Sequence, residues 1–408
     1  MYIKRTLEDV VERITKSFSV LMLTGPRQAG KTTLLKHADP GRRFVTLDDL
    51  EQRTLAQEHP ALFLERHPAP VLIDEFQYAP QLLPYIKIAV DAKKTRRIPC
   101  MGEYWLTGSQ NFSMMEGVQE SLAGRVAVLK LLGLDLAESQ DRRNRRNGLG
   151  FFERQERNFE IAKSPLQLFE IILAGDKPEI WAHRAMDRQQ YYISTVQTYL
   201  ERDVQSQLGV RQLGKFERFM RLLATRATQL LNMSRLASDV GVTVPTIHSW
   251  LTILERSFQI TMLQPYYRNL GKRQVKTPKV YFLDTGLVTH LLKWTDPLSA
   301  LNGQMAGALF ENWVVSEIIK SYWHRGEDPS LFFWRTREGD EIDLVQEKGG
   351  ELHAAEIKLS DKPRPDVFAP LDSGRKGAPL VRTKRLISPV QRSYALNRDT
   401  EVVSAWDL

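Results

Sequence analysis

Residues 18–35 read FSVLMLTGPRQAGKTTLL, and this stretch decides the fold of the N-terminal third of the chain. Its apolar run from Ser19 to Thr24 has the length and composition of a buried parallel strand. The run enters GPRQAGKT, residues 25–32, and a helical pattern follows. Strand, glycine-rich loop and helix in this order are the required context of a phosphate-binding loop. We therefore expect a parallel α/β domain that binds a nucleotide.

The loop supplies the groups that a nucleoside triphosphate needs. Its glycines let the backbone turn tightly, so that several N–H groups and the N-terminus of the next helix face the phosphates. The ammonium of Lys31 would neutralise the β- and γ-phosphates, and the hydroxyl of Thr32 would ligate Mg²⁺. The expected cofactors are therefore ATP and Mg²⁺. The expected contact residues are Gly25, Pro26, Arg27, Gln28, Ala29, Gly30, Lys31, Thr32 and Thr33.

The sequence VLIDEF at residues 71–76 predicts a second part of this site. Three apolar residues form another buried strand, and Asp74 and Glu75 emerge at its carboxyl end, which is the ligand-binding edge of an open parallel sheet. Asp74 fits the Mg²⁺ shell, and Glu75 fits the base that orients the attacking water. The alternative is a pair of solvent-exposed charges, which the phosphate-binding loop upstream disfavours.

Three further buried-strand candidates complete the expected sheet. They are RRFVTLDD (42–49), YWLTGSQ (104–110) and RVAVLKLLGL (125–134). Thr107 and Ser109 stand at the end of the second of these strands. Hydroxyl groups at that position are placed to sense the γ-phosphate.

Arg125 ends the sequence SLAGR just before the last of these strands. An arginine here can reach a phosphate in the same subunit or in a neighbouring one. A surface ion pair is the alternative role. We expect a homo-oligomer, and the choice between action within and between subunits depends on it.

Composition places broad limits on the protein. A chain of 408 residues is too long for one ordinary core, so we expect two or three domains. The net charge of +8 permits binding to a polyanion without establishing it. Cys100 is the single cysteine, which excludes disulfides within the chain and cysteine-rich zinc sites. The charged N-terminus and the lack of a long apolar run favour a cytoplasmic protein without a membrane span.

Four motifs together resemble a known family. GPRQAGKTTLL, VLIDEFQYAP, WLTGSQ and SLAGRV are similar to the AAA-type (AAA_14-like) P-loop ATPases of bacteria and archaea that carry a C-terminal DUF4143 region. TYLERDV, residues 198–204, matches a stretch seen with that region. The resemblance implies a nucleotide-dependent switch or motor built on a parallel sheet with a helical lid.

Residues 234–264 predict a helix-turn-helix followed by an apolar strand, and hence a winged helix. Ser234 is the expected N-cap of its first helix, and Gly241 lies in the turn. The exposed face of the second helix carries hydroxyls and one histidine but no Arg or Lys, so any contact with DNA should be backbone-led. A purely structural role is the alternative. The expected nucleic-acid contacts lie in the wing, at Arg268, Lys272, Arg273 and Lys276.

Near the C-terminus, GDEIDLVQEKGGELHAAEIK (339–358) predicts a hairpin that carries carboxylates. If Gly349 and Gly350 form a two-residue turn, paired residue numbers sum to 699 and Asp343 lies opposite Glu356. A turn shifted by one residue would leave the two carboxylates diagonal on one face, and an odd-length loop would separate them. Lys358 projects to the same side as Glu356.

Glu311 lies on the apolar face of a helix that starts near Gly307, where a carboxylate must be paired, neutralised or bound to a metal. Glu317 is the alternative carboxylate on that helix. Together, Glu311, Asp343 and Glu356 suit a hard divalent ion, with Lys358 steadying transition-state charge as a catalytic group. This pattern is similar to the PD-(D/E)xK nuclease superfamily. Structural ion pairs, or a site that binds without cutting, are the alternatives.

The expected fold class is α/β: a P-loop parallel sheet with a helical lid, then a winged helix and an α/β PD-(D/E)xK-like domain. The expected boundaries are 1–140 for the ATPase core, 141–230 for the lid and connecting segment, 231–295 for the winged helix, and 296–408 for the nuclease-like domain.

Two functions fit these domains. One is an ATP-driven motor or remodeller that acts on branched or single-stranded DNA. The other is a regulatory ATPase switch whose winged helix and C-terminal domain bind a protein partner, without nuclease activity. A metal-dependent nuclease that ATP merely gates is a third class.

Overall fold

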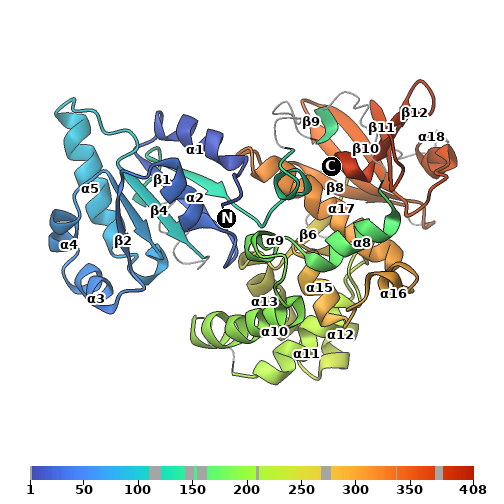
Figure 1. Cartoon of the computed structure of the whole chain (residues 1–408), viewed down its shortest axis with the longest axis horizontal. Coiled ribbons are helices and arrows are strands. Elements are labelled where there is room, and N and C mark those ends of the chain that lie inside the picture. Colours follow the sequence, from blue (N-terminus) through green and yellow to red (C-terminus); the bar gives the residue numbers. More distant parts are fainter. Residues whose placement is uncertain are drawn as a thin grey trace. The chain divides into compact units, whose positions relative to one another are not determined.

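A computed structural model describes residues 2–109, 121–142, 151–153, 163–207, 211–267, 277–336, 338–372 and 380–408. The chain forms two compact units, and many of their helices and strands are labelled in Figure 1. Unit 1 comprises Met1–Leu134, Arg256–Phe258 and Trp323–Glu327. Unit 2 comprises Asp135–Glu255, Gln259–Tyr322 and Asp328–Leu408.

Unit 1 contains a five-stranded sheet in the order β2-β3-β4-β1-β5. Every neighbouring pair in it is parallel. The five apolar runs of the sequence form these strands, so the predicted sheet is confirmed. The strands are β1 (Val20–Thr24), β2 (Arg43–Thr46), β3 (Val71–Asp74), β4 (Tyr104–Gly108) and β5 (Val126–Lys130).

Alternating side chains of β1 pack on opposite faces of this sheet, because successive residues of a strand point to opposite sides. Val20 and Met22 belong to the apolar core that also holds α3, α4 and α5. Leu21 and Leu23 belong to the core that holds α1 and α2. The sheet is therefore covered on both faces. The helices are α1 (Leu7–Thr15), α2 (Lys31–Ala38), α3 (Leu50–Glu58), α4 (Pro60–Arg66) and α5 (Leu82–Thr95), with the 3₁₀ turn η1 (Phe76–Tyr78).

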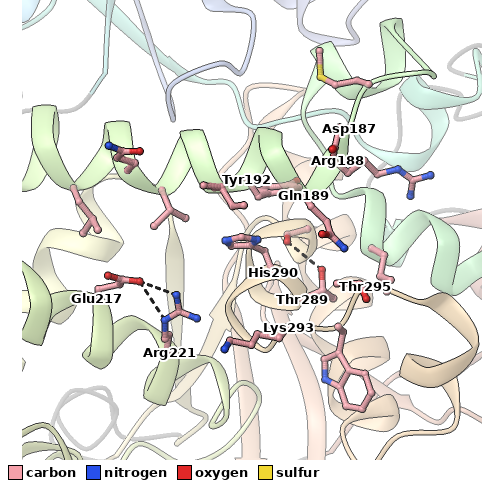
Figure 2. A pocket seen from close by; sticks show the side chains of 18 of the residues that line it. Asp187, Arg188, Gln189, Tyr192, Glu217, Arg221, Thr289, His290, Lys293 and Thr295 are labelled. Atoms are coloured by element: carbon pink, nitrogen blue, oxygen red, sulfur yellow. Dashed lines mark hydrogen bonds and ion pairs between the residues drawn. The ribbon is translucent and has the colours of Figure 1, made fainter.

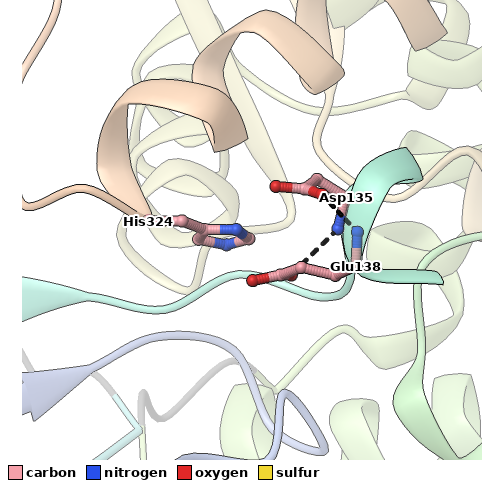
Figure 3. Close-up of side chains that lie close together, drawn as sticks. All are labelled: Asp135, Glu138 and His324. Carbon is pink, nitrogen blue, oxygen red and sulfur yellow. Dashed lines mark hydrogen bonds between the residues drawn. The ribbon is translucent and has the colours of Figure 1, made fainter. Parts of the chain in front are cut away.

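Unit 2 starts with the short helix α7 (Leu136–Ser139), which has a reciprocal cap. The Asp135 carboxylate accepts a hydrogen bond from the backbone N–H of Glu138 at 2.8 Å, and the Glu138 carboxylate accepts one from the backbone N–H of Asp135 at 3.2 Å (Figure 3). Both backbone groups would lack a partner in an uncapped helix.

A helical region follows, with η3 (Phe151–Glu153), α8 (Pro165–Ala174), α9 (Pro178–Ala182), α10 (Arg188–Thr198), α11 (Leu213–Ala224), α12 (Met233–Val240), α13 (Val244–Arg256), α15 (Thr285–Leu291) and α16 (Pro297–Leu301).

Two local features of this region stand out. The chain changes at Tyr199 from α10 to a π-helix, η4 (Tyr199–Gln207). The N-cap of α12 is Asn232, whose side chain accepts from the backbone N–H of Arg235, so the assignment of the cap to Ser234 was wrong. Gly241 has φ +78° and ends α12, as expected of the turn.

A mixed eight-stranded sheet completes unit 2, in the order β12-β13-β11-β10-β9-β8-β6-β7. The strand that follows the two helices of the predicted winged helix, β6, pairs in parallel with β8 and antiparallel with β7. One sheet thus crosses the predicted domain boundary at residue 295, and the four-domain division stays a prediction. The strands are β6 (Ile260–Pro265), β7 (Lys279–Phe282), β8 (Leu331–Arg335), β9 (Glu341–Lys348), β10 (Glu351–Ile357), β11 (Thr383–Ser388), β12 (Tyr394–Ala395) and β13 (Thr400–Ser404).

The hairpin register predicted from the Gly349-Gly350 turn is confirmed. Glu351 pairs with Lys348 and Ala355 pairs with Leu344 along β9 and β10. Helix α17 (Ala306–Trp323), which is buried along most of its length, is held to β7 by Asn312, whose side chain donates to and accepts from the backbone of Phe282 at 2.8 Å. The remaining elements are η5 (Pro365–Phe368), α18 (Ala369–Asp372) and η6 (Ala405–Asp407). Among the helices that the structure describes, none combines the length and apolar character required to cross a membrane.

Gly286, near the start of α15, is a point of very close packing inside unit 2. A Cβ atom added there would lie 2.1 Å from the hydroxyl oxygen of Tyr192 and 2.4 Å from its ring carbon Cζ. Tyr192 has no room to move, because it is buried and its hydroxyl donates to Asp284 at 3.0 Å.

We expect Gly286→Ala to lower the free energy of unfolding by about 1–3 kcal/mol, the usual cost of overpacking a core. Gly307→Ala is the matched control, since nothing lies within 4 Å of a Cβ added at Gly307 in α17. Urea denaturation monitored by far-UV circular dichroism measures both variants. Equal midpoints for the two variants would contradict the predicted clash.

Candidate functional site

The phosphate-binding loop joins β1 to α2, as the sequence predicted. Residues 25–30 form the loop, and Lys31–Thr33 form the first turn of α2. Gly25 has φ +153°, and a Cβ there would lie 1.9 Å from the carbonyl oxygen of Leu131, so this position requires glycine. The Lys31 ammonium donates to the carbonyls of Gly25 and Pro26 at 3.0 and 2.8 Å. The loop therefore curls around the lysine that is expected to meet the phosphates.

The two expected Mg²⁺ ligands of the ATP site are in contact. The Thr32 hydroxyl, from α2, donates to the Asp74 carboxylate, at the end of β3, at 2.5 Å. Thr107, at the end of β4, donates to the same carboxylate oxygen. Adjacent hydroxyl and carboxylate oxygens are the hard donors that Mg²⁺ takes beside nucleotide phosphates, so these residues fit the ion.

Glu75 follows Asp74 in a left-handed backbone conformation, with φ +55° and ψ +41°. A non-glycine residue in this region is strained, and such strain concentrates at functional sites. The Gln77 amide donates to the Glu75 carboxylate and, at 3.3 Å, to the Ser109 hydroxyl. The backbone N–H of Glu75 donates to the Thr107 hydroxyl at 3.3 Å. The expected base and both expected γ-phosphate sensors are thus linked at one edge of the sheet.

The structure does not bring Arg125 to the phosphate-binding loop. Arg125 directly precedes β5, and its backbone carbonyl accepts from Val20 at the start of β1. The loop leaves β1 at its other end, after Thr24. The Arg125 guanidinium pairs with Asp91 of α5 at 2.6 and 2.8 Å. A contact with a phosphate of its own subunit is therefore not formed, and the role between subunits stays a prediction.

Arg5 is a contributor to the loop that the sequence analysis missed. Its guanidinium is buried and donates to the carbonyls of Ala29, Leu132 and Gly133 at 2.8–2.9 Å. It therefore ties the phosphate-binding loop to the segment after β5. Hydrogen bonds to backbone carbonyls require no particular partner side chain, so no sequence motif identifies them.

In unit 2, the four residues predicted for the nuclease-like site approach one another. Asp343 on β9 accepts from the backbone N–H of Ile357 at 2.9 Å, and Glu356 on β10 accepts from the backbone N–H of Asp343 at 3.1 Å. Lys358 pairs with Glu356 at 2.6 Å and with Asp343 at 3.7 Å. Glu311 reaches the same cluster from α17. Its alternative, Glu317, instead pairs with Lys320 at 2.6 Å.

Three residues that the sequence analysis did not predict complete this C-terminal cluster. Lys279, the first residue of β7, pairs with Glu311 at 3.4 Å, with Asp343 at 3.9 Å, and also with Glu341. The Tyr281 hydroxyl donates to Glu311 at 2.7 Å. The C-terminal cluster thus comprises seven side chains: Glu311, Glu341, Asp343, Glu356, Lys279, Tyr281 and Lys358.

Burial and carboxylate neighbours shift the titration of this cluster. Burial, together with the charge of Asp343, raises the pKa of Glu311 to about 7 and that of Glu356 to about 8. Burial acts to lower the pKa of Lys279, but the charges of Glu311, Asp343 and Glu341 outweigh it and raise that pKa. The lysine therefore stays charged, while the two glutamates hold protons more tightly than they would in water.

The Lys279 ammonium contacts two of the three predicted metal ligands, Glu311 at 3.4 Å and Asp343 at 3.9 Å. The role of Glu311, Asp343 and Glu356 as ligands of a divalent ion stays a prediction.

The four residues predicted to contact nucleic acid, Arg268, Lys272, Arg273 and Lys276, lie outside the described residues. The two helices that precede them are described. Ile247, Trp250, Leu251 and Leu254 of α13 are buried.

A cavity of about 900 Å³ lies in the helical region of unit 2, between α10, α11 and α15 (Figure 2). Tyr192 and His290 lie on its wall, with ring centroids 6.1 Å apart and ring planes inclined by 27°. Arg221 on α11 pairs there with Glu217 at 2.7 Å. Among the predicted site residues that the structure describes, none lines this cavity.

Three segments of the chain match known families. Residues 17–140 match a family described as an AAA domain. Residues 166–298 and 306–408 match the domains of unknown function DUF8612 and DUF4143. The resemblance to an AAA ATPase with a C-terminal DUF4143 region is confirmed.

Relatives are known from mycobacteria. The uncharacterized proteins Rv2008c of Mycobacterium tuberculosis and Mb2031c of Mycobacterium bovis are each 31% identical to this chain over 353 residues, which is 84% of this chain and 71% of the relative. Among solved structures, the Walker-type ATPase of Pyrococcus abyssi aligns over 70% of this chain and 94% of its own, with 14% identity and a TM-score of 0.44.

Replacing Arg5 by lysine should weaken ATP binding about tenfold, because a single ammonium cannot reproduce the contacts with three carbonyls that hold the loop. Arg13→Lys on the exposed face of α1 is the matched control and should bind ATP like the parent. Titration with a fluorescent ATP analogue measures both variants. Parent-like affinity in Arg5→Lys would show that this arginine does not position the loop.

The stability of the protein should fall as the pH rises from about 4.5 to about 8, by up to about 1.4 kcal/mol per pH unit for each glutamate that is protonated only in the folded state. The sign follows from raised carboxyl pKa values. The folded state binds these protons more tightly than the unfolded chain, so their stabilisation is complete below the unfolded value near 4.5 and is lost as the pH passes about 7 to 8.

The variant Glu311→Gln should flatten this pH dependence in urea denaturation. Glu351→Gln is the control on the same hairpin, because the Arg382 hydrogen bond lowers the pKa of Glu351 and removes it from this pH range. A slope that is identical in the parent and in Glu311→Gln would contradict the assignment.

Proposed function

Because this chain belongs to the family of the mycobacterial proteins Rv2008c and Mb2031c and joins an AAA domain to a DUF4143 region, we propose that it is an ATP-hydrolysing motor or remodeller that acts on DNA. The observation that carries the ATPase part is the convergence of Lys31, Thr32 and Asp74 at one edge of a parallel sheet. The DNA part rests on the domains that follow and on the net charge of +8.

Each residue of the ATP site has a defined task in hydrolysis. The backbone N–H groups of the loop and the Lys31 ammonium bind the phosphates and hold the γ-phosphate in position. Thr32 and Asp74 would hold Mg²⁺, which would neutralise charge on the phosphate oxygens. Glu75 accepts a proton from the attacking water, and Gln77 orients the Glu75 carboxylate. Thr107 and Ser109 sense whether the γ-phosphate is present.

Contact with DNA is assigned to the winged helix formed by α12, α13 and the β6–β7 hairpin. The cationic residues of the connecting segment, Arg268, Lys272, Arg273 and Lys276, would contact the phosphate backbone rather than read bases. The nuclease-like domain would add a second surface for the strand. The protein would act as a homo-oligomer, with Arg125 facing a neighbouring subunit.

A second candidate function is a regulatory ATPase switch, in which the winged helix and the C-terminal domain bind a protein partner. Two observations favour it. The exposed face of α13 lacks Arg and Lys over residues 244–252, and Lys279 contacts carboxylates that a nuclease would use for metal. In this case nucleotide state would control association with the partner, and nucleic acid would not affect turnover.

For the ATP site, Lys31→Ala should reduce ATP binding or turnover at least about tenfold, because the phosphates lose their principal cation. Glu75→Gln should bind ATP like the parent but hydrolyse it about 100-fold more slowly, within the usual range for loss of a general base. Steady-state phosphate release and equilibrium ATP binding separate the two effects. Turnover by Glu75→Gln at the parent rate would refute the assignment of the base.

The DNA role is tested by ATP turnover in Mg²⁺ with and without duplex, single-stranded and branched DNA, with cleavage scored in the same tubes. The proposal expects stimulation by at least one DNA structure and salt-dependent binding. An ATP-gated nuclease would lose cleavage in Asp343→Ala and retain part of it in Lys31→Ala. No stimulation and no salt-dependent binding to DNA or RNA would reject the DNA role and favour the regulatory switch.

A further inference from the structure

The ammonium group of Lys279 lies among the carboxylates of the C-terminal cluster. It is 3.4 Å from Glu311 and 3.9 Å from Asp343, and it forms a closer ion pair with Glu341. These three carboxylates come from α17 and from β9, so the lysine bridges two different elements. A bound divalent cation would form the same kind of bridge.

The backbone around Lys279 keeps its side chain in this position. Lys279 begins β7, where it pairs with Leu263 of β6 on one side and with Leu230 on the other. Its side chain is 4% exposed, and the ammonium lies 5.6 Å from the centre of the Phe333 ring. If the buried ammonium moved away, its carboxylates would become unpaired buried charges. The free-energy cost of such charges keeps the lysine in place.

Charge within the cluster is already nearly balanced. The ion pairs join four carboxylates, Glu311, Glu341, Asp343 and Glu356, to the three cationic side chains of Lys279, Lys358 and Arg335. Glu356 is neutralised by Lys358 at 2.6 Å, and Glu341 also pairs with Arg335 at 2.8 Å. A dication added to this arrangement would lie next to the Lys279 ammonium and be repelled by it.

We propose that Lys279 is the resident cation of the C-terminal cluster, in the position that a divalent metal would occupy in a nuclease. An ammonium can neutralise carboxylates and hold α17 against the sheet. It cannot coordinate and acidify a water molecule, which is how a metal generates the nucleophile for phosphodiester cleavage. The domain therefore binds no divalent ion at this cluster and does not cut DNA. ATP hydrolysis and DNA binding are unaffected by this inference.

The test counts Mn²⁺ ions bound to the full-length protein without nucleotide, by electron paramagnetic resonance of the free ion. The parent should bind no Mn²⁺ that depends on Asp343, so the parent and Asp343→Asn should give the same count. Lys279→Met should gain one bound Mn²⁺ per chain and show an increase of its melting temperature in Mn²⁺. The double variant Lys279→Met/Asp343→Asn should lose both effects.

Lys320→Met is the matched control. Lys320 is 2% exposed and pairs with Glu317 at 2.6 Å and Asp176 at 3.6 Å, so its replacement also unbalances buried carboxylates, but at another place. It should be destabilised without gaining Mn²⁺. An equal gain in both variants would mean that any buried carboxylate freed of its lysine recruits the ion, and would overturn the specific role of Lys279.

The proposal can also fail in the parent protein alone. A bound Mn²⁺ that disappears in Asp343→Asn or in Glu311→Gln would overturn it, as would DNA cleavage by the parent that Asp343→Asn abolishes. This comparison decides the question even if Lys279→Met does not fold. Failure here leaves ATP turnover and its response to DNA untouched, so it is distinct from failure of the proposed function.

Discussion

The position of β1 between β4 and β5 is the constraint on which the nucleotide site depends. In a parallel sheet the carboxyl ends of neighbouring strands meet at one edge, so the phosphate-binding loop after β1 necessarily lies beside Thr107 at the end of β4. The next strand, β3, ends at Asp74 and completes the contact with Thr32. The same rule places Arg125, which precedes β5, at the opposite edge. Strand order alone therefore decides which predicted residues can contact one nucleotide within a subunit. Thr32, Asp74 and Thr107 can do so, and Arg125 cannot.

The parts of this structure that sequence predicts are those whose signal is local. The loop GPRQAGKT, the apolar runs and the Gly-Gly turn each specify their geometry within a few residues. Side chains alternate strictly along each strand, so the register set at the turn holds along the whole hairpin. Asp343 and Glu356 therefore meet as expected. Arg5 was not predicted because it acts through backbone carbonyls. Gln77 was not predicted because it acts by orienting another side chain, Glu75. The cap of α12 was misassigned by two residues because Asn and Ser serve equally well as N-caps.

Lys279 could not be found from the sequence for a different reason. It reaches the hairpin residues through two strand pairings: β7 with β6, which the predicted winged helix implies, and β6 with β8, a long-range pairing that no local pattern predicts. The carboxylates could be predicted to lie close together because they belong to one hairpin and one helix. Their counter-ion comes from a strand that the sequence assigned to the winged helix. Only a sheet that crosses the predicted boundary at residue 295 brings the two together.

Because this sheet brings Lys279 to the carboxylates, it also changes the role that the carboxylates can have. Buried carboxylates require a cation, but the requirement is equally met by a metal, a proton or a lysine. The ion pairs leave four carboxylates against three cationic side chains, and burial, with the charge of Asp343, raises the pKa of Glu311 and of Glu356. A proton can settle this difference without displacing Lys279, whereas a dication would exceed it and face the ammonium directly. The C-terminal cluster is therefore better suited to joining α17 and the two strand pairs than to activating water, and the ATP site is where this chain is built to use Mg²⁺.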